Sequence, residues 1–219
     1  MTPSLIIKLT ILLVLGLLIV WRKSKRNKTN KLISRLSDNS YSSFSLMIIF
    51  TSKKTDSKLN LKRLIESSDY EIIEINDKKD TFNNWNDNIY FDTKNIKKGI
   101  IELNELTVFN DPESIIITDR EKIQKLSNDL NCKILIGVWE RVSMTVIYEE
   151  YEKGKLLTST TIIDNKPDNA NSYVRQELID KADNESLKNE LIGSANGLKE
   201  LFDDKELNII EYTLKDNSK

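Results

Sequence analysis

The sequence predicts an α+β domain with a mixed sheet, preceded by one transmembrane helix, and three observations support this. A long apolar run, Leu5–Trp21, stands near the N-terminus. Three segments rich in β-branched and aromatic residues follow one another between positions 133 and 163, and leucines recur at helical spacing in the C-terminal third. We therefore expect a transmembrane anchor over 1–22, a basic juxtamembrane stalk over 23–43 and a soluble domain over 44–219.

The apolar run Leu5–Trp21 is predicted to span a membrane once. Its length as a helix is about 25 Å, slightly less than a ~30 Å hydrocarbon core. Lys8 can extend its ammonium to the head groups at one end, and Trp21 suits the opposite interface. A cleaved signal peptide is the alternative, but it requires positive charge before the run and a small-residue cleavage site after it. Here the dense positive charge follows the run instead.

The segment after the apolar run carries seven positive charges and no acid, from Arg22 to Arg35. The positive-inside rule places such a flank, and the domain that follows it, in the cytoplasm. Contacts with anionic lipid head groups are expected from its first basic residues, which are Arg22, Lys23, Lys25, Arg26 and Lys28. Since the first 35 residues carry +8 and the chain carries −1, residues 36–219 carry −9. A domain this acidic is not expected to bind nucleic acid.

The first part of the domain is predicted to combine short strands with one helix. Leu61, Leu64 and Ile65 share one face of that helix. The Asn- and Asp-rich segment Thr81–Asn88 is predicted as a loop anchored by Trp85. Strands are expected at Ser45–Thr51, Tyr70–Ile75, Ile89–Phe91, Gly99–Leu103, Leu106–Phe109 and Ser114–Thr118.

The second part gives the strongest β signal. Thr118 and Glu121 form a predicted capping box for a helix, whose apolar face is Ile123, Leu126 and Leu130. An antiparallel three-strand meander is expected next, over Lys133–Trp139, Met144–Tyr151 and Leu156–Ile163, and it ends at Pro167–Asn171. Gly154 suits the turn between the last two strands.

The C-terminal third is predicted to be helical. Leu187, Leu191, Ser194, Leu198 and Leu201 mark one helix face, although Gly193 and Gly197 weaken that helix by about 1 kcal/mol each. Ile209–Leu214 fits either a strand or a helix end.

The composition removes several kinds of chemistry. The chain has no histidine, one cysteine and six scattered glycines, so His-based nucleophile activation and glycine-rich phosphate loops are absent. Cys132 is interpreted as a structural thiol. We expect no cofactor, no metal and no catalytic residue. The strand-helix-meander order is similar in outline to several small bacterial domains, immunity-type proteins among them.

These exclusions favour a membrane-tethered domain that binds another protein and has no catalytic activity, with an immunity-like or scaffold role. The candidate interaction surface comprises Trp85, Trp139, Tyr148, Tyr151, Glu149 and Glu150. For Trp139 and Tyr148 the alternative is that they fill the core, whereas Trp85 and Tyr151 are expected to be more exposed. Two other functions stay open: a divergent metal-dependent hydrolase or nuclease using Asp, Glu and Lys, and an oligomerisation module driven by the C-terminal leucines.

Overall fold

The computed structural model describes residues 43–50, 54–66, 70–90, 96–114, 116–117, 119–140, 142–164, 166–169, 174–181 and 183–217. These residues belong to one compact unit, Ser42–Lys219. The predicted anchor, the stalk up to position 42 and the five predicted lipid contacts lie outside the described residues. Within them, no helix combines the length and apolar character that crossing a membrane requires.

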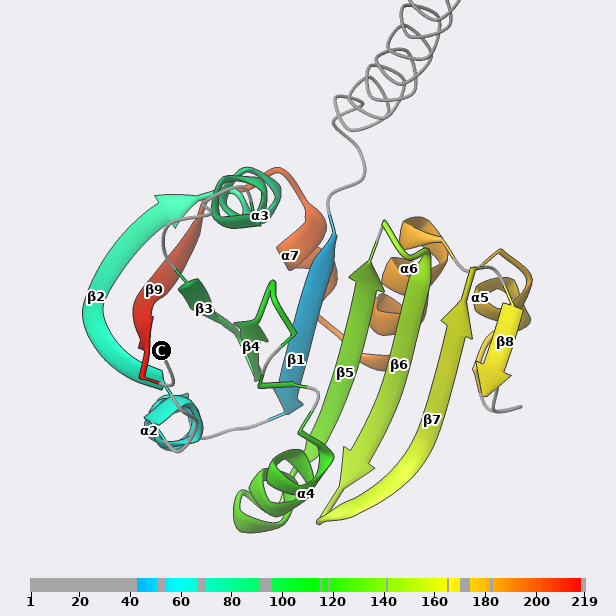
Figure 1. The fold of residues 1–219 in the computed structure, drawn as a ribbon, viewed down its shortest axis with the longest axis horizontal. Coiled ribbons are helices and arrows are strands. Elements are labelled where there is room, and N and C mark those ends of the chain that lie inside the picture. The colour runs from blue at the N-terminus through cyan, green and yellow to red at the C-terminus, as the bar shows by residue number, and fades with distance from the viewer. Residues whose placement is uncertain are drawn as a thin grey trace, which may run out of the picture. The chain divides into compact units, whose positions relative to one another are not determined.

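The domain is built on one sheet in which every strand pairs antiparallel to its neighbours. The mixed sheet expected from the sequence is therefore wrong, whereas the α+β class is confirmed. The sheet runs in the order β2-β9-β3-β4-β1-β5-β6-β7-β8 (Figure 1). Its strands are β1 (Phe44–Phe50), β2 (Tyr70–Asp80), β3 (Ile96–Leu103), β4 (Leu106–Asn110), β5 (Lys133–Glu140), β6 (Thr145–Glu152), β7 (Lys155–Ile163), β8 (Lys166–Asn169) and β9 (Leu207–Asp216).

Short helices cover both faces of the sheet and create two apolar cores. The helices are α2 (Lys54–Glu66), α3 (Phe82–Tyr90), α4 (Arg120–Asp129), α5 (Gln176–Lys181), α6 (Asn184–Ser194) and α7 (Lys199–Phe202). One face, here the α6 face, carries Leu46 and Leu135 and packs against α3, α5, α6 and α7. The other, the α4 face, carries Met47 and Ile134 and packs against α2 and α4. Because successive side chains of a strand point to opposite faces of the sheet, one strand can contribute residues to both cores.

The three segments rich in β-branched and aromatic residues form the predicted strands. The meander of β5, β6 and β7 is confirmed, and Lys153 and Gly154 both have positive φ in the turn between β6 and β7. Positive φ at both central residues is the geometry of a type I′ hairpin, which glycine accommodates without strain. Pro167 lies in the edge strand β8, the position in a sheet where proline is tolerated best.

The predicted loop Thr81–Asn88 is instead the helix α3, which also includes Ile89 and Tyr90, predicted as the start of a strand. The Thr81 hydroxyl accepts the N–H of Asn84 and caps the helix. Phe82, Trp85 and Ile89 are spaced to face the α6-face core and are all buried there. Burial of this apolar stripe outweighs the weak helix propensity of the intervening Asn and Asp residues.

The predicted strand Ser114–Thr118 is also wrong at its described positions. Ile116 and Ile117 are buried, as the sequence suggests, but they lie in a turn. Their backbone N–H groups bond to the Asp111 carboxylate at 2.6 and 3.1 Å instead of to a neighbouring strand. The following helix α4 is capped by Asp119, whose side chain accepts the N–H of Lys122, and not by the predicted Thr118–Glu121 box.

The predicted C-terminal helix is divided into α6 and α7. Gly197, with φ of +91°, lies between them. The four leucines of the predicted face are fully buried in the α6-face core and so pack inside the domain. The ambiguous segment Ile209–Leu214 belongs to the strand β9, which inserts between β2 and β3.

Candidate functional site

The aromatic residues of the predicted interaction surface are buried. Trp139 and Tyr148 lie in the α6-face core, as the core-filling alternative requires. Trp85 and Tyr151, expected to be exposed, are 2% and 0% exposed. The indole N–H of Trp85 donates to buried Glu211 at 3.0 Å, and Lys78 and Lys97 lie 3.4 and 3.5 Å from the same carboxylate. The six-membered ring of Trp85 stacks against Gly99, where a side chain would leave it no room.

Glu149 and Glu150, the acids of that predicted surface, bond to neighbouring side chains on opposite faces of β6. On the α4 face, Glu149 is buried and accepts bonds from Arg120, Tyr151 and Ser159. The hydrogen bond and charge of Glu149 raise the pKa of Arg120. Burial, followed by the bond to Glu149, raises the pKa of the Tyr151 phenol. This network ties the start of α4 to the sheet.

Glu150 lies on the α6 face, where it accepts the Tyr148 hydroxyl and pairs with Lys133 at 3.1 Å. The Tyr148 oxygen is also 2.8 Å from the Ser194 hydroxyl, at the end of α6. Burial raises the pKa of Tyr148, which therefore stays a neutral donor. Nearby, burial raises the pKa of Glu190, whose carboxylate accepts the N–H of Arg175 at 3.0 Å. These polar groups fasten α6 to the meander.

Cys132 is an intermediate, partly buried residue beside the α4-face core. Burial raises the pKa of its thiol to about 11, so the reactive thiolate is scarce at neutral pH. This environment agrees with the structural interpretation of the residue.

A buried lysine fixes the turn after β4. Lys98 is fully buried and pairs with Asp111, which is also fully buried, and with Glu113. Asp111 additionally accepts the N–H groups of Ile116 and Ile117. Because both partners of this lysine sit in the turn 111–114, the turn is held against the sheet on the α4 face.

A hollow of about 480 Å³ opens beside this turn, at the end of the sheet where β5 finishes and β6 begins. Val138 and Ile147 on β5 and β6 form its apolar floor. The turn 111–114 lines it with Pro112, Glu113 and Ser114. The last residue of β5, Glu140, the first residue of β6, Thr145, and Ser143 in the connection between them complete the lining. The hollow is therefore apolar at its base and polar at its rim.

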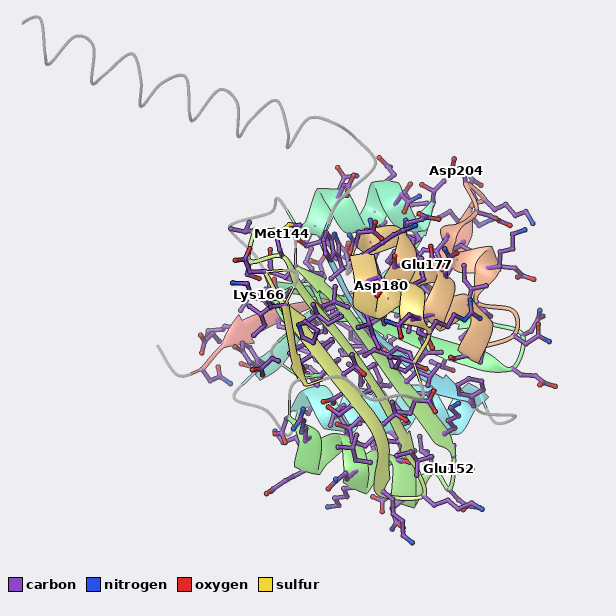
Figure 2. All side chains as sticks on the ribbon, turned by 90° about the vertical axis from the view of Figure 1, so that its right-hand side faces the viewer. Met144, Glu152, Lys166, Glu177, Asp180 and Asp204 are labelled. Atoms are coloured by element: carbon purple, nitrogen blue, oxygen red, sulfur yellow. The ribbon has the colours of Figure 1, made fainter. Side chains whose placement is uncertain are left out.

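Exposed apolar side chains surround this end of the sheet. Val142, in the β5–β6 connection, is 80% exposed. Ile147 pairs with Thr161 on β7, and Ile163 projects two residues further along the same face with 46% exposure. Figure 2 shows Met144 and Lys166 near this end of β6 and β7 and Glu152 at the other end. Exposed apolar groups around a polar-rimmed hollow are typical of protein-binding surfaces.

None of the hollow's lining residues belongs to the interaction surface predicted from the sequence. A signal was present only in part: the polar residues Glu140 and Ser143 lie between two predicted strands, and Asp111-Pro112 is a turn signal after another. Their convergence depends on the antiparallel pairing of β1 with both β4 and β5.

Within the residues that the structure describes, no three His, Cys, Asp or Glu side chains are grouped so that they could hold a metal ion. Comparisons of the chain with protein-family models, curated proteins and solved structures found no match.

Proposed function

We propose that this chain is a membrane-tethered, cytoplasm-facing domain that binds another protein and has no catalytic activity. The membrane and cytoplasmic assignments rest on the apolar run Leu5–Trp21 and its basic flank. One structural observation supports the binding role: the hollow on the α4 face lies among exposed apolar side chains at the end of β5, β6 and β7. We call this region, with Val138, Val142, Ile147 and Ile163, the docking surface.

The fold supports such a role because the docking surface stands on rigid elements. Its floor belongs to the paired strands β5 and β6, and its rim includes a turn fixed by the buried Lys98 pair. A surface held in place by packing loses little conformational entropy when a partner binds.

Photo-crosslinking in intact cells tests the proposal. A photoreactive phenylalanine at Ser143, on the rim of the hollow, should yield an adduct with one defined protein. The same amino acid at exposed Asp180, on α5 beyond the opposite face (Figure 2), should not.

Two residues of β7 provide a matched pair of variants. Ile163→Asp places a charge on the docking surface and should abolish the Ser143 adduct. Leu157→Asp makes the same change on the same strand at nearly equal exposure, 47% against 46%, but near the other end of β7. It should leave the adduct intact. Equal adducts from Ser143 and Asp180, or equal loss with both β7 variants, would refute the docking surface.

A further inference from the structure

Among the described residues that line it, the hollow within the docking surface has negatively charged side chains and no positively charged one. Glu113 and Glu140 line it, and its other lining residues are neutral. Lys98, which pairs with the lining residue Glu113, is fully buried and is also paired with Asp111. Residues 36–219 carry −9 in total, so the surroundings reinforce the local field.

Each of the two carboxylates is oriented through one oxygen. Glu140 Oε1 accepts the Val142 N–H at 2.8 Å and the Ser43 hydroxyl at 3.3 Å. Glu113 Oε2 is held by the Lys98 ammonium. In the described part of the chain, Glu140 Oε2 and Glu113 Oε1 have no hydrogen-bond partner. Each acid is thus fixed by the domain and retains one acceptor oxygen.

We propose, building on the protein-binding function above, that this hollow receives an arginine side chain of the bound protein. The guanidinium donates to the remaining oxygens of Glu113 and Glu140, and the aliphatic stem packs on Val138, Ile147 and Pro112. A hard divalent cation would require six or more oxygen ligands and would leave the apolar floor unused. A lysine would fill the same space, but it cannot present the planar fork of donors that two separate carboxylates match.

The position of the hollow suits an anchor residue. The exposed side chains of Val142 and Ile163 lie at the same end of the sheet and can exclude water around a bound guanidinium. An arginine at the centre of an interface with an apolar surround is a common source of binding energy. The partner is therefore expected to be a protein with a basic surface that displays one protruding arginine.

Methyl NMR of the full-length chain in detergent micelles tests this without knowledge of the partner. The probes are N-acetyl-arginine methylamide, the corresponding lysine compound and the neutral citrulline compound. The arginine compound should shift the Val138 and Ile147 methyl signals saturably at millimolar concentration, since it forms only one anchor contact. The lysine compound should bind at least about fivefold more weakly and the citrulline compound should cause no saturable shift.

Two substitutions locate the site. Glu140→Gln should weaken arginine binding about tenfold, the effect of losing one charge-assisted bond, and Glu113→Gln should act in the same direction. Glu177→Gln is the matched control, because this acid lies on α5 at the opposite face and pairs with Lys181 at 3.1 Å. It should leave binding unchanged. Unshifted signals of the buried Leu187 and Leu191 methyls report that each variant is folded.

Each remaining outcome contradicts the inference. Absence of a shift with the arginine compound, equal binding of the lysine or citrulline compound, or full binding by Glu140→Gln would overturn it. The result is separable from the proposed function. If a Ser143 adduct forms in cells but the arginine compound does not bind, only the arginine inference fails. If the arginine compound binds but no adduct forms in cells, only the docking surface fails.

Discussion

Replacing Gly99 with alanine should destabilise the domain strongly, because this position on β3 has no space for a side chain. A Cβ there would lie 2.6 and 2.9 Å from Cζ2 and Cζ3 of Trp85. Trp85 is buried and cannot swing into solvent, so its ring or the strand must shift. Overpacking of this kind costs about 1–3 kcal/mol.

The same shift would disturb a polar contact. The Trp85 indole donates to buried Glu211 at 3.0 Å, and a hydrogen bond to a charged group contributes about 1.5–3 kcal/mol. Together the two effects lower the free energy of unfolding by about 2.5–6 kcal/mol. At a slope of about 2 kcal/mol per molar urea, the unfolding midpoint falls by roughly 2 M.

Urea denaturation of the full-length chain in micelles, followed by tryptophan fluorescence, measures this loss. Gly193→Ala is the matched control. Its Cβ would also be crowded, 2.5 Å from Cζ of Arg175, but that side chain is half exposed and can move away. Alanine also favours the helix by about 1 kcal/mol, so this variant should change the midpoint little.

The same substitution in a chain that carries Trp85→Phe tests whether the Gly99–Trp85 contact causes the loss of stability. In a Trp85→Phe chain the smaller ring leaves space, so Gly99→Ala should cost about 2 kcal/mol less than in the natural chain. An unchanged midpoint for Gly99→Ala, or the same loss in both backgrounds, would show that the Gly99–Trp85 contact does not govern stability.

Three further predictions follow from buried polar groups. Burial raises the pKa of the Cys132 thiol to about 11, against an ordinary value of 9.0. At pH 8 this thiol should therefore react with a disulfide reagent about a hundredfold more slowly in the native domain than in the unfolded chain. Equal rates in the native and unfolded chain would contradict this. Burial raises the pKa of Glu190 above its ordinary 4.5, so the folded domain favours the protonated carboxyl. The contribution of this carboxyl to folding stability is therefore full below pH 4.5 and is lost as the pH rises through the folded-state pKa. Glu190→Gln should therefore increase the melting temperature more at pH 7 than at pH 4.5, and an equal change at both would refute the assignment. Lys98→Met leaves the buried Asp111 carboxylate without its ion pair and should cost about 3–5 kcal/mol in urea unfolding, whereas Lys98→Met with Asp111→Asn should recover part of the loss; no recovery would mean that the ion pair is not the cause.

The meander was predictable from the sequence because its signal is local. β5, β6 and β7 are each rich in β-branched and aromatic residues over eight or nine positions, and Gly154 marks one of their turns. The helix α3 was not predictable in the same way. Its Asn and Asp residues favour a loop locally, and only the distant core formed by strands such as β1 and β5 makes the burial of Phe82 and Trp85 decisive.

The candidate site was not predictable because its parts are distant in sequence. Glu113 and Glu140 meet at one hollow only because β1 pairs with β4 on one side and β5 on the other. The sequence favoured aromatic residues, since Trp and Tyr dominate many interfaces. In this fold Trp85 and Tyr151, which were expected to be more exposed, are buried instead, and smaller residues such as Val142 and Ile163 remain exposed.

The position of β9 has a consequence for biosynthesis. β2 pairs within the sheet only through β9, and β9 begins 127 residues after β2 ends. At about 5–20 residues per second, a ribosome needs roughly 6–25 s to deliver the missing strand. During that interval the edges of β2 and β3 that will pair with β9 stay open in the nascent polypeptide. A chaperone that shields strand edges should therefore act on it, and closure of the sheet should be a late event of folding.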